Sequence, residues 1–329
     1  MKVAVFSCKP YDKRTLNEFI ADKDLEMNFF ESRLSEETVS LVKGFDAVSC
    51  FVNDDVNAKV IQQLKQQGVN TIALRCAGFN NVDLAAAKQQ GVSVFHVPDY
   101  SPTSVAEHAV ALIMALNRKT HRAYHRVKEG NFALEGLLGF NLEGKTVGCI
   151  GTGRIGAAFC HIMKGFGCRV ICYDIYPSDT LIEMGCAYVS LNELYQQSDI
   201  ISLHCPLTES THHLIDNQSL SKMKDGVMII NTSRGALVHA QEAIDALYSG
   251  KIGYLGLDVY EQENKIFFED MSSHIIQDSV FQLMLTFPNV VVTGHQGYFT
   301  DVALNHIAQT TVENLEQSQQ TNPQQRRLA

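Results

Sequence analysis

Short apolar runs alternate with longer amphipathic stretches along the first hundred residues. The runs at 3–6, 46–51, 71–74 and 92–97 are typical of buried strands, and a phenylalanine pair at 29–30 predicts another. Helical patterns lie between them, such as 58–67, which ends before Gly68. Strands that alternate with helices in this way predict a parallel sheet with helices on both faces.

The pattern changes at Ser101, where we place a domain junction. Ser101 and Pro102 can begin a helix, and apolar positions on one face predict a single long helix to about residue 127. A second alternating run opens at Lys145, with predicted strands at 145–150, 169–174, 200–203, 227–231, 254–259 and 290–293. The glutamine-rich tail at 317–327 is predicted to fray.

Composition narrows the class of protein. A chain of 329 residues exceeds what one core usually organises, so we expect two domains. Its 45% hydrophobic and 19% charged residues exclude collagenous, coiled-coil and wholly disordered chains. The net charge of −9 argues against a nucleic-acid or anionic-membrane partner. The longest apolar run, 109–116, is far shorter than the roughly 20 residues that cross a bilayer.

The cysteines indicate the compartment. Nine are scattered without a repeating interval, and no CxxC pair occurs. This pattern does not fit a disulfide framework or a zinc ribbon, so we expect reduced thiols in a cytoplasmic protein.

The strongest motif is a strand, then G-x-G-x-x-G, then a helix. Gly151 allows a tight turn, Gly153 lets the backbone approach a pyrophosphate, and Gly156 allows close helix packing. Asp174 ends the next strand, 18 residues after Gly156, near the spacing of a ribose-binding carboxylate. The carboxylate would repel a 2′-phosphate, so the motif predicts NAD rather than NADP.

This loop and four further segments resemble the D-isomer-specific 2-hydroxyacid dehydrogenases. They are residues 75–83, 151–156, 231–235, 256–263 and 293–296, and their order and spacing span nearly the whole chain. Residues 267–270 are similar to the D-lactate branch of that family. The resemblance implies an α/β fold of two doubly wound, Rossmann-like parallel-sheet domains, with the NAD domain inserted in the substrate domain. We therefore expect a substrate domain at 1–100, an NAD-binding domain at 101–298, and a return to the substrate domain at 299–329.

Reduction of a 2-keto acid by NADH needs a group for the carboxylate, a polarising group and a proton donor. Arg234 and His295 both follow predicted strands at their carboxyl ends, where ligands bind in such sheets. A guanidinium matches a keto-acid edge, and a protonated imidazole can donate the proton. Glu263, five residues after Asp258, is the implied partner of His295, whereas Glu261 is read as a solvated neighbour.

The resemblance also implies binding residues by position. For the cofactor these are Gly151, Gly153, Arg154, Ile155, Gly156, Asp174, Cys205, Pro206, Thr211, Thr232, Ser233 and Asp258. For the substrate they are Ala77, Gly78 and Tyr100, with Tyr298 and Phe299 as caps of a small pocket in a cleft between the domains. We expect Arg75, Arg154 and Arg234 around that cleft.

Two positions depart from the family pattern, which often has proline before the histidine and alanine two after it. Here these residues are Gly294 and Gly297, which leaves the substrate preference open. His121 and His125 share one face of a predicted helix, but no acidic third ligand lies between them, so no metal site is expected.

The expected function is NAD-dependent interconversion of pyruvate and D-lactate by a homodimer or higher homo-oligomer. One alternative is another D-2-hydroxyacid dehydrogenase, acting on 2-ketoisocaproate, phenylpyruvate or hydroxypyruvate. A remote alternative is an NAD(H)-sensing corepressor, since the same fold serves in transcriptional regulation.

Overall fold

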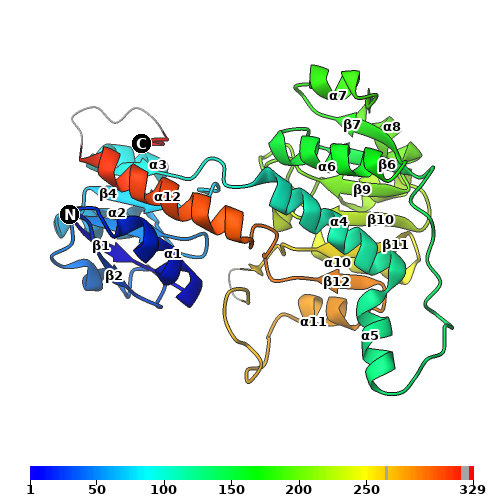
Figure 1. The fold of residues 1–329 in the computed structure, drawn as a ribbon, viewed down its shortest axis with the longest axis horizontal. Helices are drawn as coiled ribbons and strands as arrows, with labels where there is room; N and C mark the ends of the chain where they lie inside the picture. Colours follow the sequence, from blue (N-terminus) through cyan, green and yellow to red (C-terminus); the bar gives the residue numbers. More distant parts are fainter. Residues whose placement is uncertain (264–265, 320–325) are drawn as a thin grey trace. The chain divides into compact units, whose positions relative to one another are not determined.

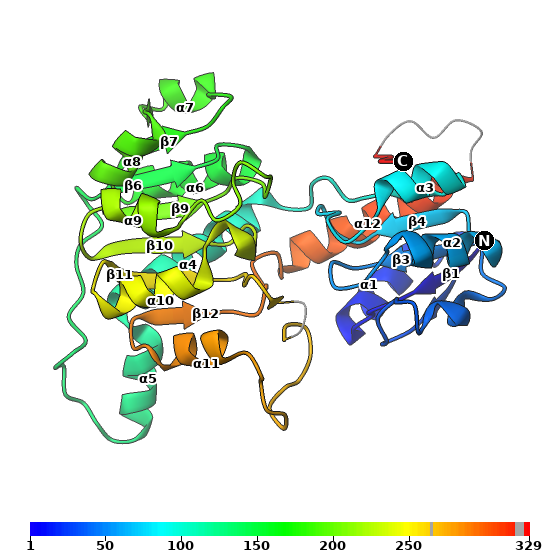
Figure 2. The ribbon, with the colours of Figure 1, turned by 180° about the vertical axis from the view of Figure 1, so that it is seen from behind.

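The computed structural model describes residues 1–263, 266–319 and 326–329. The chain divides into two compact units, Met1–Ser101 with Phe299–Ala329, and Pro102–Tyr298. Each unit contains a sheet whose strands all run parallel, as the alternating pattern predicts. The α/β class with two parallel-sheet domains is therefore confirmed (Figures 1 and 2).

The sheet of the first unit has the order β2-β1-β3-β4-β5 within the described residues. Its strands are β1 (Lys2–Val5), β2 (Glu26–Phe29), β3 (Ala47–Cys50), β4 (Thr71–Leu74) and β5 (Ser93–Phe95). On one face, α1 (Pro10–Ile20) and α12 (Asp301–Ser318) pack side by side (Figure 1). The other face carries α2 (Ala58–Gln66) and α3 (Leu84–Gln90), with the 3-10 helix η1 (Val39–Val42) beside α2. The last helix in the sequence thus completes the core of the first strands.

The end of the chain pairs with β5. The Leu328 N–H donates to the Val94 carbonyl oxygen at 2.7 Å, and Arg327 forms an antiparallel bridge with Phe95. The predicted fraying is therefore wrong for 317–319, where α12 continues to Ser318, and for 326–327, because backbone pairing orders these residues. The intervening residues 320–325 of that prediction lie outside the described residues.

The sheet of the second unit has the order β12-β11-β10-β9-β6-β7-β8 within the described residues. The strands are β6 (Thr146–Ile150), β7 (Arg169–Tyr173), β8 (Ala187–Tyr188), β9 (Ile200–Leu203), β10 (Val227–Asn231), β11 (Ile252–Leu257) and β12 (Val290–Val292). The central strands are buried along their whole length because helices cover both faces.

Two hydrophobic clusters fill the two sides of this sheet. One packs α4 (Pro102–Arg118), α6 (Arg154–Gly165) and α7 (Asp179–Glu183) onto the sheet. The other packs α8 (Leu191–Gln197), α9 (Asn217–Lys222), η2 (Gly235–Leu237), α10 (Ala240–Tyr248) and α11 (Ser279–Thr286). The helices of the first cluster lie in front of the sheet in Figure 1, and those of the second cluster lie in front of it in Figure 2.

The single helix predicted for 101–127 is wrong, because the chain breaks at Lys119. This residue has φ of 50°, which is left-handed, and it separates α4 from α5 (Thr120–Lys128). The Lys119 ammonium donates to the carbonyl oxygens of Leu138 at 2.6 Å and Asn117 at 3.4 Å. Such tertiary contacts offset the energetic cost of a left-handed backbone at Lys119, which the apolar periodicity of the sequence cannot reveal.

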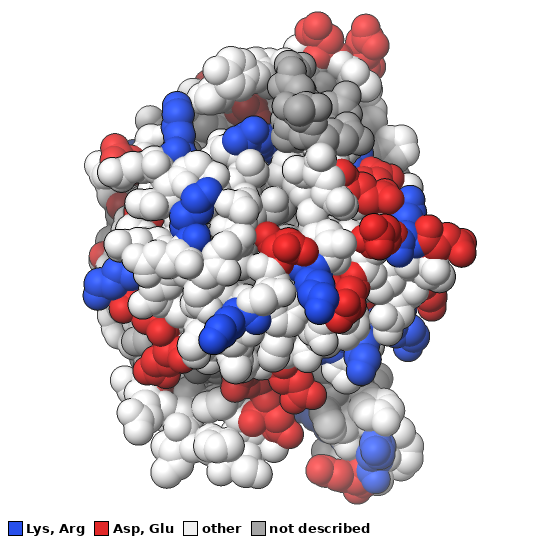
Figure 3. All heavy atoms as spheres, turned by 90° about the vertical axis from the view of Figure 1, so that its left-hand side faces the viewer, with Lys and Arg blue, Asp and Glu red and all other residues white. Residues whose placement is uncertain are grey.

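Charge is distributed without a dominant sign on the face drawn in Figure 3, where acidic and basic side chains are interspersed. The described residues of that face form no continuous basic surface for a polyanion. Among the described residues, no helix combines the length and the apolar character needed to cross a bilayer.

Candidate functional site

The strand order of the second unit reverses between β6 and β9, which lie side by side. The helix after β6 packs on one face of the sheet and the helices after β9 on the other. In open α/β sheets, ligands bind outside the carboxyl ends of the strands at such a switch point. The loops after β6, β7, β9, β10, β11 and β12 carry the sequence-predicted cofactor and catalytic residues of this unit.

The glycine loop follows β6 and begins α6. Gly151 has φ of 90°, and a Cβ there would lie 2.5 Å from the Cys205 backbone nitrogen. A Cβ at Gly156 would lie 2.0 Å from the Gly151 carbonyl oxygen, which leaves no room for a side chain. A Cβ at Gly153, at the N-cap of α6, would meet no atom within 4 Å. The open side at Gly153 beside a helix N-terminus suits a pyrophosphate; Ile155 is half-buried and Arg154 exposed in the first turn.

Asp174 lies against this loop. Its Oδ2 accepts hydrogen bonds from the Thr152 N–H at 2.5 Å and the Thr152 hydroxyl at 3.1 Å. Tyr188 donates from its hydroxyl to the same Thr152 hydroxyl at 2.8 Å. Asp174 is therefore fixed beside the phosphate loop, where the spacing places a ribose-binding carboxylate.

The loop after β9 forms the other side of the switch point. Cys205 is buried, its carbonyl oxygen accepts a hydrogen bond from the Ser233 hydroxyl at 2.7 Å, and burial raises the pKa of its thiol to about 11. That thiol is therefore not poised as a nucleophile. The Thr211 hydroxyl donates to the Pro206 carbonyl oxygen at 2.7 Å and accepts from the Thr208 N–H at 2.7 Å, so it stabilises the turn that follows.

The loop after β10 carries Thr232, Ser233 and Arg234. Thr232 is buried, and its hydroxyl oxygen has no hydrogen-bond partner among the described residues. The Ser233 N–H donates to the Asn231 side-chain oxygen at 3.0 Å, and the Arg234 Nη1 donates to the Ser233 carbonyl oxygen at 2.7 Å. An unpartnered buried hydroxyl is costly in a finished core, which makes Thr232 a candidate ligand contact.

The Arg234 loop packs against the loop after β11. A Cβ at Gly235 would lie 2.1 Å from the Tyr260 carbonyl carbon, so the two backbones touch at this point. The Tyr260 N–H in turn donates to Glu263 Oε2 at 2.9 Å. These contacts link the segment that carries Arg234 to the segment that carries Glu263.

The other oxygen of Glu263 meets His295. Glu263 Oε1 lies 2.8 Å from His295 Nδ1, and the two side chains are 15% and 18% exposed. A carboxylate at Nδ1 favours a proton on that nitrogen and leaves Nε2 for a reacting group. His295 itself has φ of 53°, and its N–H donates to the Asp258 carbonyl oxygen at 2.7 Å. A histidine in this strained conformation is typical of a functional site.

Asp258 holds the turn that bears the histidine. Its side chain is buried, Oδ1 accepts from the Thr293 hydroxyl at 2.5 Å and the Gln296 N–H at 2.9 Å, and Oδ2 accepts from the Gly297 N–H at 2.8 Å. His108 Nε2 lies 3.2 Å from Oδ1. Burial alone would raise the Asp258 pKa, but hydrogen bonds from His108 and Thr293 and the charge of His108 outweigh it and lower that pKa. This network did not emerge from the sequence, where Asp258 matched only a cofactor-contact position.

Glu261, interpreted from the sequence as a solvated neighbour, is exposed on the surface of the second unit. The fold also brings the loop after β9 against it, so that its Oε1 lies 2.7 Å from His213 Nε2. His204 is half-buried after β9, where its Nε2 lies 2.8 Å from the Ser202 hydroxyl, and desolvation lowers its pKa to about 3.

The three substrate-side residues lie in the first unit. Ala77 and Gly78 follow β4, and the Ala77 carbonyl oxygen contacts His96 Nδ1 at 3.0 Å. The Tyr100 carbonyl oxygen contacts His306 Nδ1 at 2.9 Å. Tyr298 is buried at the end of the second unit.

Arg75, expected beside an anion, is buried within the first unit. Its guanidinium donates to the carbonyl oxygens of Phe6 at 2.8 Å and Ser49 at 3.1 Å, and it lies 3.9 Å from Asp12. The expectation for Arg75 is therefore wrong, because its donors bind the strand ends of its own sheet.

The fold and these loops define an NAD-binding doubly wound domain with an Arg, Glu and His set at its strand ends. Residues 110–297 match the family model described as the D-isomer specific 2-hydroxyacid dehydrogenase, NAD binding domain. The chain belongs to this family and is an NAD-dependent oxidoreductase.

Among its relatives is the D-lactate dehydrogenase of Escherichia coli strain K12, 52% identical over 315 residues that cover 96% of each chain. The apo structure of D-lactate dehydrogenase from E. coli superposes with a TM-score of 0.92 at 48% identity, covering all of both chains. A D-lactate dehydrogenase from Aquifex aeolicus, solved in complex with NAD and lactic acid, has a TM-score of 0.85 at 36% identity, covering 95% of this chain and 94% of that one.

The observed geometry fits the cofactor. The absent side chains at Gly151 and Gly156 allow the tight loop, and the space at Gly153 admits a phosphate. Thr232 offers a buried hydroxyl without a protein partner among the described residues. Asp174 stands at the end of β7 beside the loop.

Proposed function

We propose that this chain is a D-lactate dehydrogenase that interconverts pyruvate and D-lactate with NAD(H). The observation that carries the proposal is the contact of 2.8 Å between His295 Nδ1 and Glu263 Oε1, on a turn beside the Arg234 loop. The identity to D-lactate dehydrogenases supports pyruvate as the keto acid.

His295 is the acid in pyruvate reduction and the base in D-lactate oxidation. Glu263 Oε1 accepts a hydrogen bond from His295 Nδ1–H and so fixes the ring, which leaves Nε2 to exchange a proton with the substrate oxygen. Asp258 holds the histidine turn through its bonds to Gln296 and Gly297.

Arg234 binds the keto acid through its guanidinium, whose paired donors match a carboxylate and the neighbouring carbonyl oxygen. It stabilises the negative charge that develops on that oxygen. Bound NADH supplies the hydride, and the reaction is pyruvate + NADH + H⁺ ⇌ D-lactate + NAD⁺.

Binding roles are proposed for the other matched residues. Gly151, Gly153, Arg154, Ile155 and Gly156 form the pyrophosphate loop, and Asp174 binds the adenosine ribose. Cys205, Pro206 and Thr211 form the adenosine wall, and Thr232, Ser233 and Asp258 lie on the nicotinamide side. Ala77, Gly78 and Tyr100 bind the substrate carboxylate, and Tyr298 and Phe299 limit its side chain.

A kinetic panel tests the substrate. Pyruvate, hydroxypyruvate, 2-ketoisocaproate and phenylpyruvate are compared by kcat/KM with NADH, and the product stereochemistry is determined by chiral chromatography. The proposal expects pyruvate to be preferred and only the D-isomer to form. Preference for a bulkier keto acid would assign another D-2-hydroxyacid dehydrogenase, and an L-product would exclude both.

The alternative of an NAD(H)-sensing corepressor is tested with Arg234→Gln. An enzyme loses turnover by about 100-fold or more, as when an oxyanion-stabilising donor is removed, while NADH binding by fluorescence persists. If the wild-type chain binds NADH and turns over none of the panel, the corepressor is favoured.

We also propose a homodimer in a reducing cytoplasm. Phe132, Leu134 and Leu138 are 74%, 82% and 88% exposed in the segment after α5, and a cluster of apolar side chains of this kind marks an interface. All nine cysteines are free and buried, which suits a reducing compartment. Analytical ultracentrifugation of the wild type and of Leu138→Glu tests the dimer, since a charge there would shift it to monomer.

A further inference from the structure

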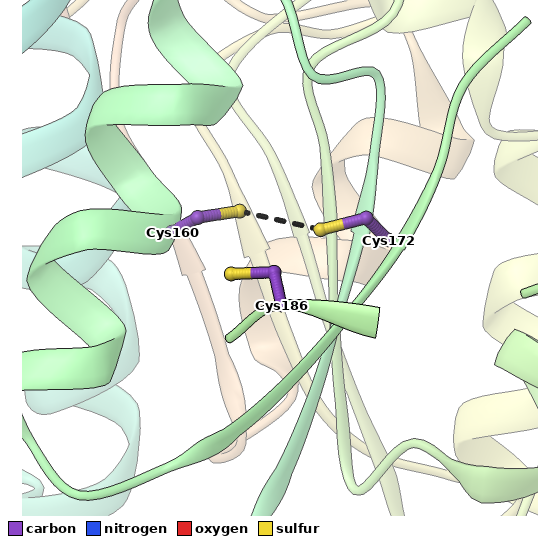
Figure 4. A group of neighbouring side chains, drawn as sticks. All are labelled: Cys160, Cys172 and Cys186. Atoms are coloured by element: carbon purple, nitrogen blue, oxygen red, sulfur yellow. Dashed lines mark hydrogen bonds between the residues drawn. The ribbon is translucent and has the colours of Figure 1, made fainter. Parts of the chain in front are cut away.

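Three buried cysteine sulfurs lie together in the second unit, away from the loops described above. Cys160 is on α6, Cys172 on β7, and Cys186 immediately precedes β8. All three Sγ atoms lie within 4.8 Å of one another, and those of Cys160 and Cys172 are 3.7 Å apart. Figure 4 shows the three side chains facing a common space from three different elements.

The size of this triangle matches a thiolate metal site. Zinc binds cysteine sulfur at about 2.3 Å with tetrahedral geometry, so two sulfurs on one ion are about 3.8 Å apart. The observed Cys160–Cys172 separation of 3.7 Å is close to that edge. The side chains also need little rearrangement, because all three sulfurs already converge.

Zinc sites are tetrahedral, so the three cysteine thiolates supply three of the four ligands and a small donor such as water completes the set. All three side chains are buried.

A positive charge adjoins the cluster. Lys164, one helical turn after Cys160, places its ammonium 3.4 Å from the carbonyl oxygen of Gly185, the residue before Cys186. Its charge acts on Cys186 and offsets part of the negative charge that thiolate ligands bring. Packing of small apolar thiols would explain their burial, but not the convergence of sulfurs beside a lysine.

We propose that Cys160, Cys172 and Cys186 bind one thiophilic cation of the Zn²⁺ class as a structural site. Thiolates select such ions over Mg²⁺ or Ca²⁺. The ion ties α6 to β7 and to the start of β8, and it takes no part in hydride transfer. The absence of a CxxC pair hides this site from the sequence, because the three residues are 12 and 14 positions apart and meet only in the fold.

The test uses the reduced, full-length protein under anaerobic conditions. Co²⁺ is titrated as a spectroscopic probe, Zn²⁺ is added to displace it, and the bound metal is counted per chain. We expect one equivalent with a thiolate-to-Co²⁺ charge-transfer band, displacement by Zn²⁺, and a higher Tm with Zn²⁺. Cys160→Ala and Cys186→Ala should lose the band and more than about 100-fold in affinity, since even partners of metal ligands cost 10–100-fold.

Cys168→Ala is the matched control. Cys168 is buried in the same unit, but its thiol contacts the Leu142 carbonyl oxygen instead of the cluster, so this variant should bind like the wild type. Cys160→Val, which keeps apolar volume, replaces Cys160→Ala if that variant does not fold. NADH binding by each variant verifies the fold.

Three results would overturn the proposal. They are no charge-transfer band in the wild type, unchanged binding in Cys160→Ala and Cys186→Ala, or binding that is lost in His213→Ala. The last result would place the metal at the surface group of His212, His213 and Glu261, which is the other set of neighbouring ligand atoms among the described residues.

Discussion

Replacing Asp258 by asparagine tests whether the buried carboxylate holds the histidine turn. Oδ2 accepts the Gly297 N–H at 2.8 Å, and Oδ1 accepts from Thr293 and Gln296. An asparagine keeps one oxygen but presents an NH₂ group to one set of donors. A lost bond to a charged group is worth about 1.5–3 kcal/mol, and the orphaned N–H adds about 1–3 kcal/mol. We therefore expect Asp258→Asn to destabilise the protein by about 3–5 kcal/mol.

The effect appears in both stability and turnover. For a unit of this size, that loss lowers Tm by roughly 10 °C. A shift of His295 by about 1 Å would lower kcat by about 100-fold. Differential scanning calorimetry and steady-state pyruvate reduction measure the two effects, and Asp245→Asn, at an exposed position on α10, is the control that should change neither.

The stability difference between the wild type and Asp258→Asn should depend on pH in one direction. The Asp258 pKa is lowered in the folded protein, so its carboxylate stabilises the fold above the unfolded-state pKa. That contribution disappears as the pH falls through the folded-state pKa. The stability gap between wild type and Asp258→Asn should thus be largest near neutral pH and should close in acid. A gap that is absent at pH 7, or that widens in acid, would refute the reasoning.

Three further predictions concern the loops of the second unit. Gly156→Ala should abolish NADH binding, measured by fluorescence, and lower Tm, measured by calorimetry. The reason is that its Cβ would lie 2.0 Å from the Gly151 carbonyl oxygen. Normal NADH binding by this variant would contradict the prediction. Asp174→Ala should raise the ratio of kcat/KM with NADPH to kcat/KM with NADH by about tenfold or more, because the repulsion between the carboxylate and the 2′-phosphate is lost. An unchanged ratio would remove Asp174 from ribose recognition. Glu263→Gln should lower kcat of pyruvate reduction by about 100-fold, because the carboxylate that orients the His295 ring is lost, while Glu261→Gln should leave kcat unchanged. Equal kcat values for the two variants would remove Glu263 from its positioning role.

Local patterning determined the secondary structure and the sheets. The apolar runs identified β1, β3, β4 and β6 because strands buried on both faces are continuously hydrophobic. The sequence pattern did not predict the helix break at Lys119, because the left-handed backbone there is stabilised by a hydrogen bond to the Leu138 carbonyl oxygen, outside the helix. The pairing of Arg327 with Phe95 was not predicted either, because it joins residues that are far apart in the sequence.

The identity of the chemical groups could also be read from the sequence, but their surroundings could not. Arg234 and His295 stood out because a polar residue at the carboxyl end of a buried strand faces the ligand edge of the sheet. Arg75 had the same signal and proved to be buried, because its donors meet carbonyl oxygens at 2.8 and 3.1 Å on neighbouring strands. The sequence does not show at which strand ends a polar side chain already has its hydrogen-bond partners within the protein.

Thus the sequence by itself determined the α/β class, the NAD loop and the choice of Arg, Glu and His. Only the tertiary structure decided that Asp258 holds the histidine turn, that Glu261 pairs with His213, and that three scattered cysteines form one cluster. The physical reason is that propensity and periodicity act over a few residues. A hydrogen-bond network or a thiol cluster instead depends on side chains that the sheet order brings together from distant parts of the chain.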